Sequence, residues 1–347
     1  MLRRYAAPIV VLLSVLKTSP SDAATCIEFY EAERVAAFES DAISESSGLA
    51  VSRSHSGLLW THNDSGDEAQ IYALNQSGVS QGIIKLSNAT ARDWEAMALG
   101  PCGTSTCIVV GDVGDNNAIR DDVALWRLPE PSPTGPGTSQ ITTAEELRIQ
   151  YPDGPQDCEG IAIDPLTGDT LLVEKSMTAK ARTYLVALSD WEEETESPLL
   201  VQELDTIDFD TDSLTGGLVT GIDIAPSGTE LFVRTYVAGF HVPLVRDATG
   251  RIAGYGEPRL VSVFDEGQCE AVAYNGDGLE LWFTCEDENG PIARATCKTI
   301  QDDDTGTTTT IDREGCDCST SQSPLLAVML LMTWFYGRSA RRPSSAN

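Results

Sequence analysis

A short motif recurs five times along the chain, and this repeat constrains the fold more than any other feature of the sequence. Each copy has a variable first residue, a polar second residue, and then small and apolar residues. The copies are Ser46–Val51, Trp94–Leu99, Cys158–Ile163, Val219–Ile224 and Cys269–Tyr274. Short apolar runs bounded by turn residues are typical of buried β-strands. We therefore predict five equivalent strands, each opening one unit of a structural repeat.

Further apolar strands follow each copy of the motif. Second strands are predicted at Leu58–Thr61, Cys107–Val110, Thr170–Val173, Glu230–Val233 and Leu279–Thr284. Third strands are predicted at Gln70–Leu74, Val123–Leu128, Thr183–Leu188, Phe240–Val245 and Pro291–Thr296. Fourth strands are predicted at Gln81–Leu86, Glu146–Tyr151, Leu199–Leu204 and Arg259–Val263. Four strands per unit, with loop insertions, are typical of propeller blades.

The fifth unit lacks a fourth strand, and Val35–Phe38, ahead of the first unit, can supply it. We therefore predict an all-β protein with one five-bladed β-propeller over residues 24–300, closed by this N-terminal strand. A six-bladed propeller is the second choice, and a split sandwich is the third.

The chain contains nine cysteines, more than a reduced protein commonly needs. The candidate disulfides are Cys102–Cys107 at a hairpin tip, Cys269–Cys285 across another hairpin, and Cys26–Cys297 between the two ends of the domain, with Cys158 left over. A single sequence does not settle the pairing.

Both ends of the chain carry targeting patterns. A basic start, an apolar run over Tyr5–Leu16 and the small residues around Ala23 predict a signal peptide over residues 1–23. An acidic, Thr-rich linker with Cys316 and Cys318 is predicted over 301–318, and an apolar segment with an Arg cluster over 319–347. Its apolar run is shorter than the ~20 residues of a typical membrane span.

This C-terminal arrangement resembles the MYXO-CTERM sorting signals of myxobacteria. The resemblance implies processing near Cys316 and Cys318 and display at the cell surface; a permanent tail anchor is the alternative. We expect an exported monomer, located at the cell surface, at the outer membrane or in the periplasm. Any contact with the membrane is expected through the C-terminal tail alone.

The formal net charge of the chain is −30. A protein of this charge cannot neutralise phosphates and release their counterions, so nucleic acid is not expected as a partner. The hydrophobic content of 41% is still sufficient for a packed core. Divalent cations are expected partners.

The second residue of each motif provides the candidate metal ligands. They are Ser47, Glu95, Glu159, Thr220 and Glu270. Equivalent positions of a propeller lie on a ring around its axis, so these oxygen-bearing side chains would converge. Three converging carboxylates repel one another unless they bind a cation, take up protons or contact water. Calcium suits a flexible set of oxygen ligands. The alternative is that these residues face bulk water.

The ring order resembles that of the calcium-activated nucleotidases, the animal apyrases. The segment from Arg92-Asp93-Trp94-Glu95 to Val110–Gly114 is similar to their second blade. This resemblance implies a five-bladed propeller with a central calcium ion. The chain also looks like the exported bacterial propellers of the broad phytase-like class.

The second strand of a blade runs antiparallel to the first, so its end lies near the ring. This predicts that basic residues around the ring bind phosphate oxygens while the metal polarises the phosphoryl group. The predicted substrate-binding residues are Arg92, Arg120, Lys175 and Arg234. Asp64 or Asp112 could orient the attacking water as a general base. The alternative is that each arginine pairs with a neighbouring aspartate. The loop Asp112–Asn117 is either a second cation site or a capped turn.

Two functions are compatible with these sequence features. One is a calcium-dependent phosphohydrolase acting on nucleotides or other phosphate esters. The alternative is a non-catalytic surface propeller that binds a protein or glycan ligand and uses calcium only structurally. The sequence contains neither H-E-x-x-H nor G-x-S-x-G and only three histidines, which disfavours zinc-protease and serine-hydrolase chemistry.

Overall fold

The computed structural model describes residues 26, 28–192, 197–209 and 216–298. The predicted signal peptide (1–23), linker (301–318) and C-terminal segment (319–347) lie outside the described residues. Within the described part of the chain, we find no helix with the length and apolar character needed to cross a membrane.

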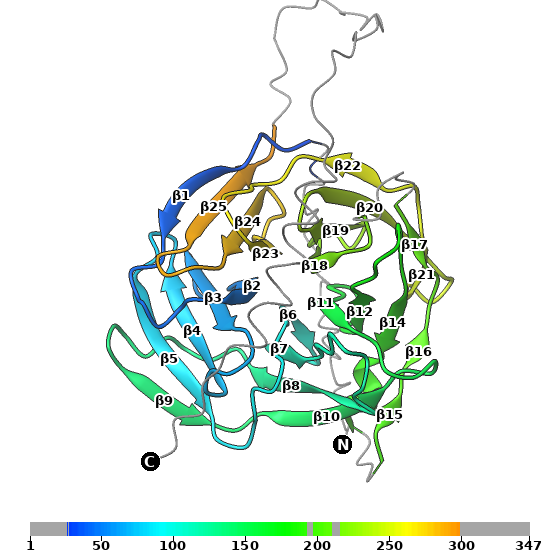
Figure 1. Ribbon diagram of the computed structural model, residues 1–347, viewed down its shortest axis with the longest axis horizontal. Coiled ribbons are helices and arrows are strands. Elements are labelled where there is room, and N and C mark those ends of the chain that lie inside the picture. The colour runs from blue at the N-terminus through cyan, green and yellow to red at the C-terminus, as the bar shows by residue number, and fades with distance from the viewer. Residues whose placement is uncertain (1–25, 27, 193–196, 210–215, 299–347) are drawn as a thin grey trace, which may run out of the picture.

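Five β-sheets are arranged around a common axis and form a five-bladed β-propeller, which confirms the predicted fold and excludes six blades (Figure 1). Each inner strand packs against the inner strands of both neighbouring blades, so the circle is closed. The inner strands are β2 (Ser46–Val51), β6 (Ala96–Cys102), β11 (Cys158–Ile163), β18 (Val219–Ile224) and β23 (Cys269–Tyr274).

The next two strands of each blade continue as an antiparallel meander. The second strands are β3 (Leu58–Asn63), β7 (Ser105–Asp112), β12 (Thr170–Glu174), β19 (Glu230–Thr235) and β24 (Glu280–Cys285). The third strands are β4 (Gln70–Asn75), β8 (Val123–Pro129), β14 (Thr183–Val186), β20 (Gly239–Arg246) and β25 (Pro291–Thr296). All ten lie at the predicted places, with ends that differ by a few residues.

The outer edges of the blades are less regular. The outer strands are β5 (Ser80–Leu86), β10 (Glu145–Gln150), β16 (Gln202–Glu203), and the pair β21 (Ile252–Tyr255) and β22 (Arg259–Val261), both paired with β20. The fifth blade takes its outer strand β1 (Glu33–Ala37) from the N-terminal end of the domain. Figure 1 shows β1 beside β25, which confirms the predicted closure.

The prediction of one continuous outer strand over Leu199–Leu204 was wrong. Its first part, β15 (Leu199–Leu200), pairs in parallel with β10 of the second blade, whereas β16 belongs to the third blade. Val201 between them is buried. The segment therefore crosses from one blade to the next, with its apolar residue anchored between the two sheets.

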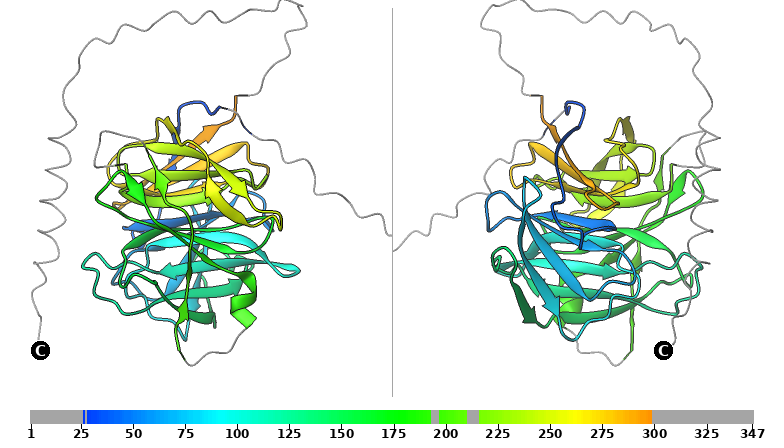
Figure 2. Two further views of the ribbon diagram at one scale, coloured as in Figure 1. Left: turned by 90° about the vertical axis from the view of Figure 1, so that its right-hand side faces the viewer. Right: turned by 60° about the vertical axis from the view of Figure 1, so that its left-hand side comes forward.

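Several short elements were not predicted, because the sequence carries no recognisable pattern for them. β9 (Ser139–Thr142) extends the first blade in parallel with β5, and β13 (Lys180–Ala181) pairs with β17 (Ile207–Asp208). A 3-10 turn, η1 (Leu188–Glu192), follows β14 and is visible at the edge of the molecule in Figure 2. Elements this short are fixed by contacts with neighbouring blades rather than by their own pattern.

Small residues at the third motif position allow the inner strands to approach one another. A Cβ atom on Gly221 would lie 2.6 Å from the main-chain oxygen of Glu270 in the next blade. A Cβ atom on Gly48 would lie 2.8 Å from the main-chain nitrogen of Met97. Larger side chains at these two positions would therefore push adjacent blades apart.

All three candidate disulfides are present. They are Cys26–Cys297, Cys102–Cys107 and Cys269–Cys285, and Cys158 is free and buried. Disulfides are typical of proteins in oxidising compartments, so these bonds are compatible with an exported protein.

We predict that the Cys26–Cys297 disulfide contributes most to stability, because its loop spans 271 residues and that of Cys102–Cys107 only 5. In the chain-entropy description, loops of these lengths contribute about 6 and about 2 kcal/mol respectively. The double variant Cys26→Ser/Cys297→Ser should therefore unfold at a lower denaturant concentration than Cys102→Ser/Cys107→Ser. Equal unfolding midpoints would contradict the proposed role of the disulfide in closing the ring.

Candidate metal centre

In four of the five blades, the second motif residue lies at a β-bulge. The pairing of β2 with β3, β11 with β12, β18 with β19 and β23 with β24 shifts register at this residue. The four bulged residues are Ser47, Glu159, Thr220 and Glu270. In the second blade, Glu95 directly precedes β6, and its main-chain N–H donates to Gly111 (3.1 Å). A β-bulge redirects a side chain away from the regular alternation of a strand.

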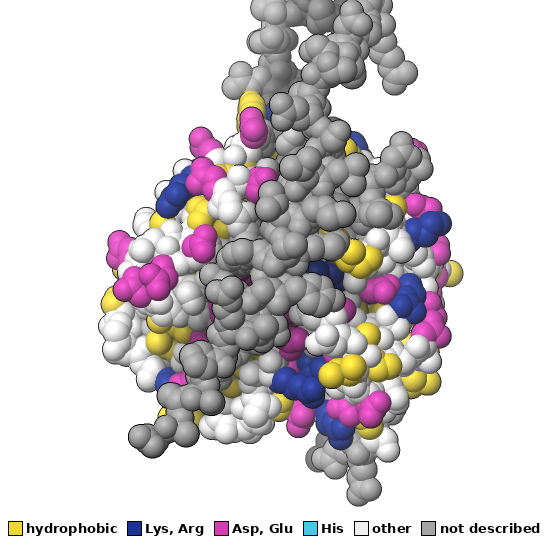
Figure 3. Space-filling view, viewed as in Figure 1, with side chains coloured by type: hydrophobic (Ala, Val, Ile, Leu, Met, Phe, Trp, Pro, Cys, Tyr) yellow, Lys and Arg dark blue, Asp and Glu magenta, His cyan; other side chains and the backbone are white. Residues whose placement is uncertain are grey.

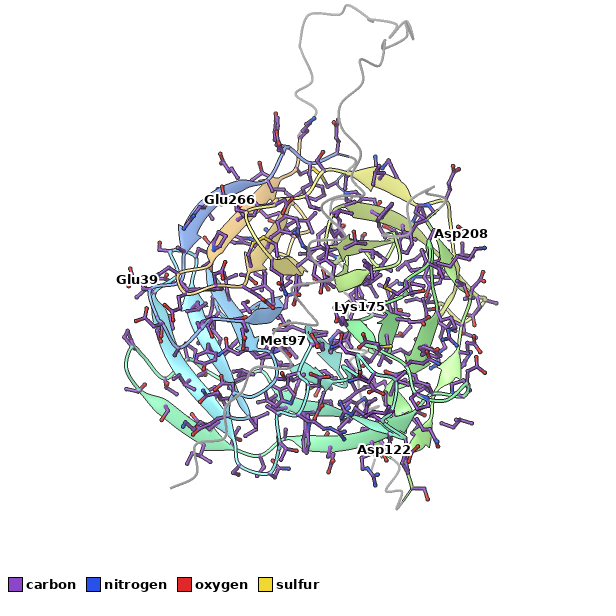
Figure 4. The ribbon with its side chains drawn as sticks, in the orientation of Figure 1. Glu39, Met97, Asp122, Lys175, Asp208 and Glu266 are labelled. Carbon is purple, nitrogen blue, oxygen red and sulfur yellow. A yellow bond between two sulfur atoms is a disulfide. The ribbon has the colours of Figure 1, made fainter. Side chains whose placement is uncertain are left out.

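All five predicted ring residues are buried, with exposures of 1–5%. A second layer lies next to them, formed by the fourth residue of each motif: Leu49, Met97, Ile161, Ile222 and Val272. These apolar side chains leave a cavity of about 10 Å³ on the axis, around the space of one water molecule. Figure 4 shows Met97 and Lys175 near the axis, far from Glu39 and Asp208 at the rim. The channel is therefore almost completely filled at this level.

Carboxylates converge on one side of the ring. Oxygens of Asp64, Asp93 and Glu95 all lie within 4.8 Å of one another. A calcium ion holds its oxygen ligands at 2.3–2.6 Å, so three oxygens with this spacing can bind one ion. Asp64 follows β3 of the first blade, and Asp93 and Glu95 precede β6 of the second.

The three ring glutamates do not form such a group among the residues that the structure describes. That Glu95, Glu159 and Glu270 share one ion therefore stays a prediction. Glu95 groups instead with two aspartates from the loops above the ring. Asp93 was not predicted as a ligand, although it lies two residues before the predicted ligand Glu95.

The end of β7 and the loop after it hold Asp93 in place. The carboxylate of Asp112 accepts hydrogen bonds from the Asp93 main-chain nitrogen (3.1 Å) and from Arg120 Nη1 (2.8 Å). The Gly114 main-chain nitrogen donates to the Asp93 carbonyl oxygen (3.2 Å). A Cβ atom on Gly114 would lie 2.6 Å from Cγ of Glu95, so a glycine is needed here. The Asp112–Arg120 pair thus supports the candidate metal ligands.

This arrangement differs from the roles predicted for Asp112 and Arg120. Their side chains form a buried ion pair with exposures of 5% and 6%, so neither faces a ligand. The hypothesis that Asp112 orients water and that Arg120 binds phosphate is not supported by this geometry. The alternative, an arginine paired with a nearby aspartate, describes both residues.

Arg234 is also enclosed by the protein. It is fully buried, and its guanidinium donates to the carbonyl oxygens of Cys269 (2.7 Å) and Phe264 (2.8 Å). Burial lowers the pKa of Arg234 to about 10. The predicted phosphate-binding role is therefore replaced by a structural one beside Glu270. Arg92, in contrast, is exposed to solvent.

Lys175 reaches the ring from the loop after β12. Its ammonium forms an ion pair with Glu159 Oε1, lies 3.0 Å from the Tyr236 hydroxyl and 5.1 Å from the centre of the Tyr236 ring. Burial alone would lower the pKa of Lys175, but the Glu159 carboxylate and neighbouring charges raise it well above its ordinary value. The contact with Glu159 therefore favours the charged form of Lys175.

The carboxylates around the ring are held in an environment that disfavours their charge. Burial, followed by repulsion from other acidic groups, raises the pKa of Asp64 to about 7, of Asp93 to about 6 and of Glu286 to about 10. Burial also raises the pKa of Glu95, with further contributions from Asp64 and other nearby carboxylates. Such a group takes up protons or a cation, and either event relieves the repulsion.

His62 is not suited to act as a base at this site. It is fully buried, lies edge-on to Trp94 with ring centroids 5.6 Å apart, and has its Nδ1 2.9 Å from the Asn63 carbonyl oxygen. Burial lowers its pKa to about 4. The imidazole is thus neutral at physiological pH and belongs to the packing of the blade.

No protein-family model matches the chain, and no curated protein matches it. Among solved structures, the chain is similar to an auxiliary nutrient binding protein from Bacteroides thetaiotaomicron VPI-5482, with 10% identity and a TM-score of 0.40. The match covers 72% of this chain and 57% of the other, so the chain spans little more than half the length of that protein. These comparisons do not show the resemblance to nucleotidases, to phytase-like propellers or to MYXO-CTERM signals.

The raised pKa values predict how the stability of the cation-free protein depends on pH. The ordinary value for an aspartate is 3.8, whereas the folded values are about 7 for Asp64 and about 6 for Asp93. Between about pH 4 and 7 the folded state therefore retains protons that the unfolded chain has lost. This stabilisation is complete below pH 4 and is lost as the pH rises through 7.

With a chelator present, the melting temperature should fall between pH 5 and pH 8 as these groups ionise. The Asp64→Asn variant should show a smaller fall because it removes the group with the higher of the two aspartate pKa values. A melting temperature that rises over this range in the wild-type protein, or an unchanged slope in Asp64→Asn, would contradict this assignment.

Proposed function

We propose that this chain is a non-catalytic, ligand-binding β-propeller that holds a calcium ion on Asp64, Asp93 and Glu95. The observation that carries the proposal is the convergence of these three carboxylates, whose oxygens all lie within 4.8 Å of one another. A divalent ion at this position would offset the repulsion that raises their pKa values. It would also join the first two blades at the mouth of the propeller.

The chemistry of the site favours calcium among divalent cations. The three candidate ligands offer only oxygen, as hard cations require, and they come from two loops and one strand start. Magnesium demands near-ideal octahedral geometry, whereas calcium tolerates irregular sets of six to eight oxygens. Ligands beyond the three carboxylates could come from water or from the bound partner, so the ion can take part in ligand binding.

The same geometry favours binding over hydrolysis. A phosphohydrolase needs cationic groups facing the substrate phosphate, yet Arg120 and Arg234 are buried and bonded within the protein. Lys175 is paired with Glu159. Of the four predicted phosphate-binding residues, Arg92 has an exposed side chain. We therefore prefer a protein or glycan ligand at the mouth to a phosphorylated substrate.

We also propose that the protein is exported through its N-terminal signal peptide and displayed at the cell surface. The three disulfides support an oxidising compartment. Asp and Glu side chains are distributed over the blades on the face seen in Figure 3, in keeping with a soluble surface module.

Calcium titration tests the metal site directly. We predict that the wild-type protein binds one ion and that Glu95→Gln or Asp93→Asn reduces the affinity at least 100-fold, because each removes a charged ligand. The matched control is Asp208→Asn, since Asp208 is exposed at the rim and pairs with Lys180. Isothermal titration calorimetry measures all four proteins. Equal affinities in Glu95→Gln and Asp208→Asn would contradict the site.

Phosphate release from nucleoside diphosphates and phytate, with calcium and with chelator, separates binding from hydrolysis. We expect no release above background in either condition. Calcium-dependent release that is lost in Glu95→Gln would instead establish the phosphohydrolase alternative.

A further inference from the structure

The ring contains two unlike halves. On the side of the first two blades, Asp64, Asp93 and Glu95 converge, and the nearby Arg120 guanidinium pairs with Asp112. On the side of the third and fourth blades, the Lys175 ammonium lies between Glu159 and Tyr236. The chain therefore supplies its own cation to one half of the ring.

One carboxylate oxygen of Glu159 is available to bind a cation. Its Oε1 pairs with Lys175, whereas its Oε2 is a buried oxygen without a hydrogen-bond partner in the described part of the chain. Glu159 is 3% exposed and lines the small axial cavity together with Ser47. A buried carboxylate oxygen left without a partner is costly, so this atom is available to a cation that enters the ring.

We infer that Lys175 is a tethered counter-ion that occupies the place of a second divalent cation and so limits the propeller to one metal ion. This inference rests on the proposed function, because it presumes an ion at Asp64, Asp93 and Glu95. The ammonium and a divalent ion cannot both lie against Glu159 without strong repulsion in a buried site. Lys175 thus acts as a specificity-determining residue for metal stoichiometry.

Removing the Lys175 charge would leave the Glu159 carboxylate without its cation. Both oxygens of Glu159 would be free, and the Tyr236 hydroxyl would lose the ammonium that lies 3.0 Å from it. Glu270 and Thr220 belong to the same ring, and the Thr220 hydroxyl donates to the Glu270 carbonyl oxygen (3.2 Å). Calcium accepts carboxylate and hydroxyl oxygens of this kind as ligands, so a second ion would bind at Glu159 in place of the ammonium.

The test compares Lys175→Met with the wild-type protein and with Lys180→Met. Lys180 follows Lys175 along the chain, in the short strand β13, and its side chain is 62% exposed and pairs with Asp208 at the surface, so it is a matched control. Calorimetric titration and native mass spectrometry count the calcium ions bound to each full-length protein. We expect one ion in the wild type and in Lys180→Met, and two in Lys175→Met. One ion in all three proteins would overturn the inference.

A second variant keeps the test informative if Lys175→Met does not fold. In this inference the ionic partner of Glu159 is Lys175 and not the metal ion. Glu159→Gln should therefore bind one calcium ion with an affinity within 10-fold of the wild type. A loss of 100-fold or more would show that Glu159 ligates the ion, and would overturn the inference. The double variant Lys175→Met/Glu159→Gln should return from two ions to one; two ions in it would contradict the role of Glu159.

The outcomes for the two proposals are distinct. A wild-type protein that binds no calcium contradicts the proposed function, and with it the premise of this inference. A wild-type protein that binds one ion, with unchanged stoichiometry in Lys175→Met, contradicts only the role of Lys175.

Discussion

Electrostatic repulsion between buried carboxylates is the constraint on which the centre of this propeller depends. Each blade begins with a polar residue that a bulge or strand start directs toward the axis, and three of the five are glutamates. Asp64, Asp93 and Glu286 add further carboxyl groups, and burial raises the pKa of each. The fold thus creates a site in which cations or protons are needed for a low-energy state.

Closure of the ring makes this concentration of charge possible. β1 completes the fifth blade, and the Cys26–Cys297 disulfide ties the two ends of the domain together. The hydroxyl of Ser46 in the first blade lies 2.8 Å from that of Thr284 in the fifth. The apolar layer next to the ring excludes most solvent from the axis. Repulsion at the mouth is therefore opposed by packing and covalent closure around the whole circle.

The repeat allowed most of the fold and part of the site to be predicted, because equivalent positions in a propeller are equivalent in space. The five inner strands and the polar ring residues follow from this rule. It does not extend to residues whose partners lie in other blades or loops. Arg120 and Arg234 were expected to face a ligand, but their bonds to Asp112 and to main-chain carbonyls are set by tertiary contacts. Asp93 joins the candidate ligands for the same reason, since Asp112 at the end of β7 positions it.

Crystals grown with calcium replaced by terbium, and measured at a wavelength where terbium scatters anomalously, test the central claim most directly. We predict one strong anomalous peak within bonding distance of Asp64, Asp93 and Glu95, and none between Glu159 and Glu270. A peak on the axis that is shared by all three ring glutamates, or no peak at the mouth at all, would contradict it.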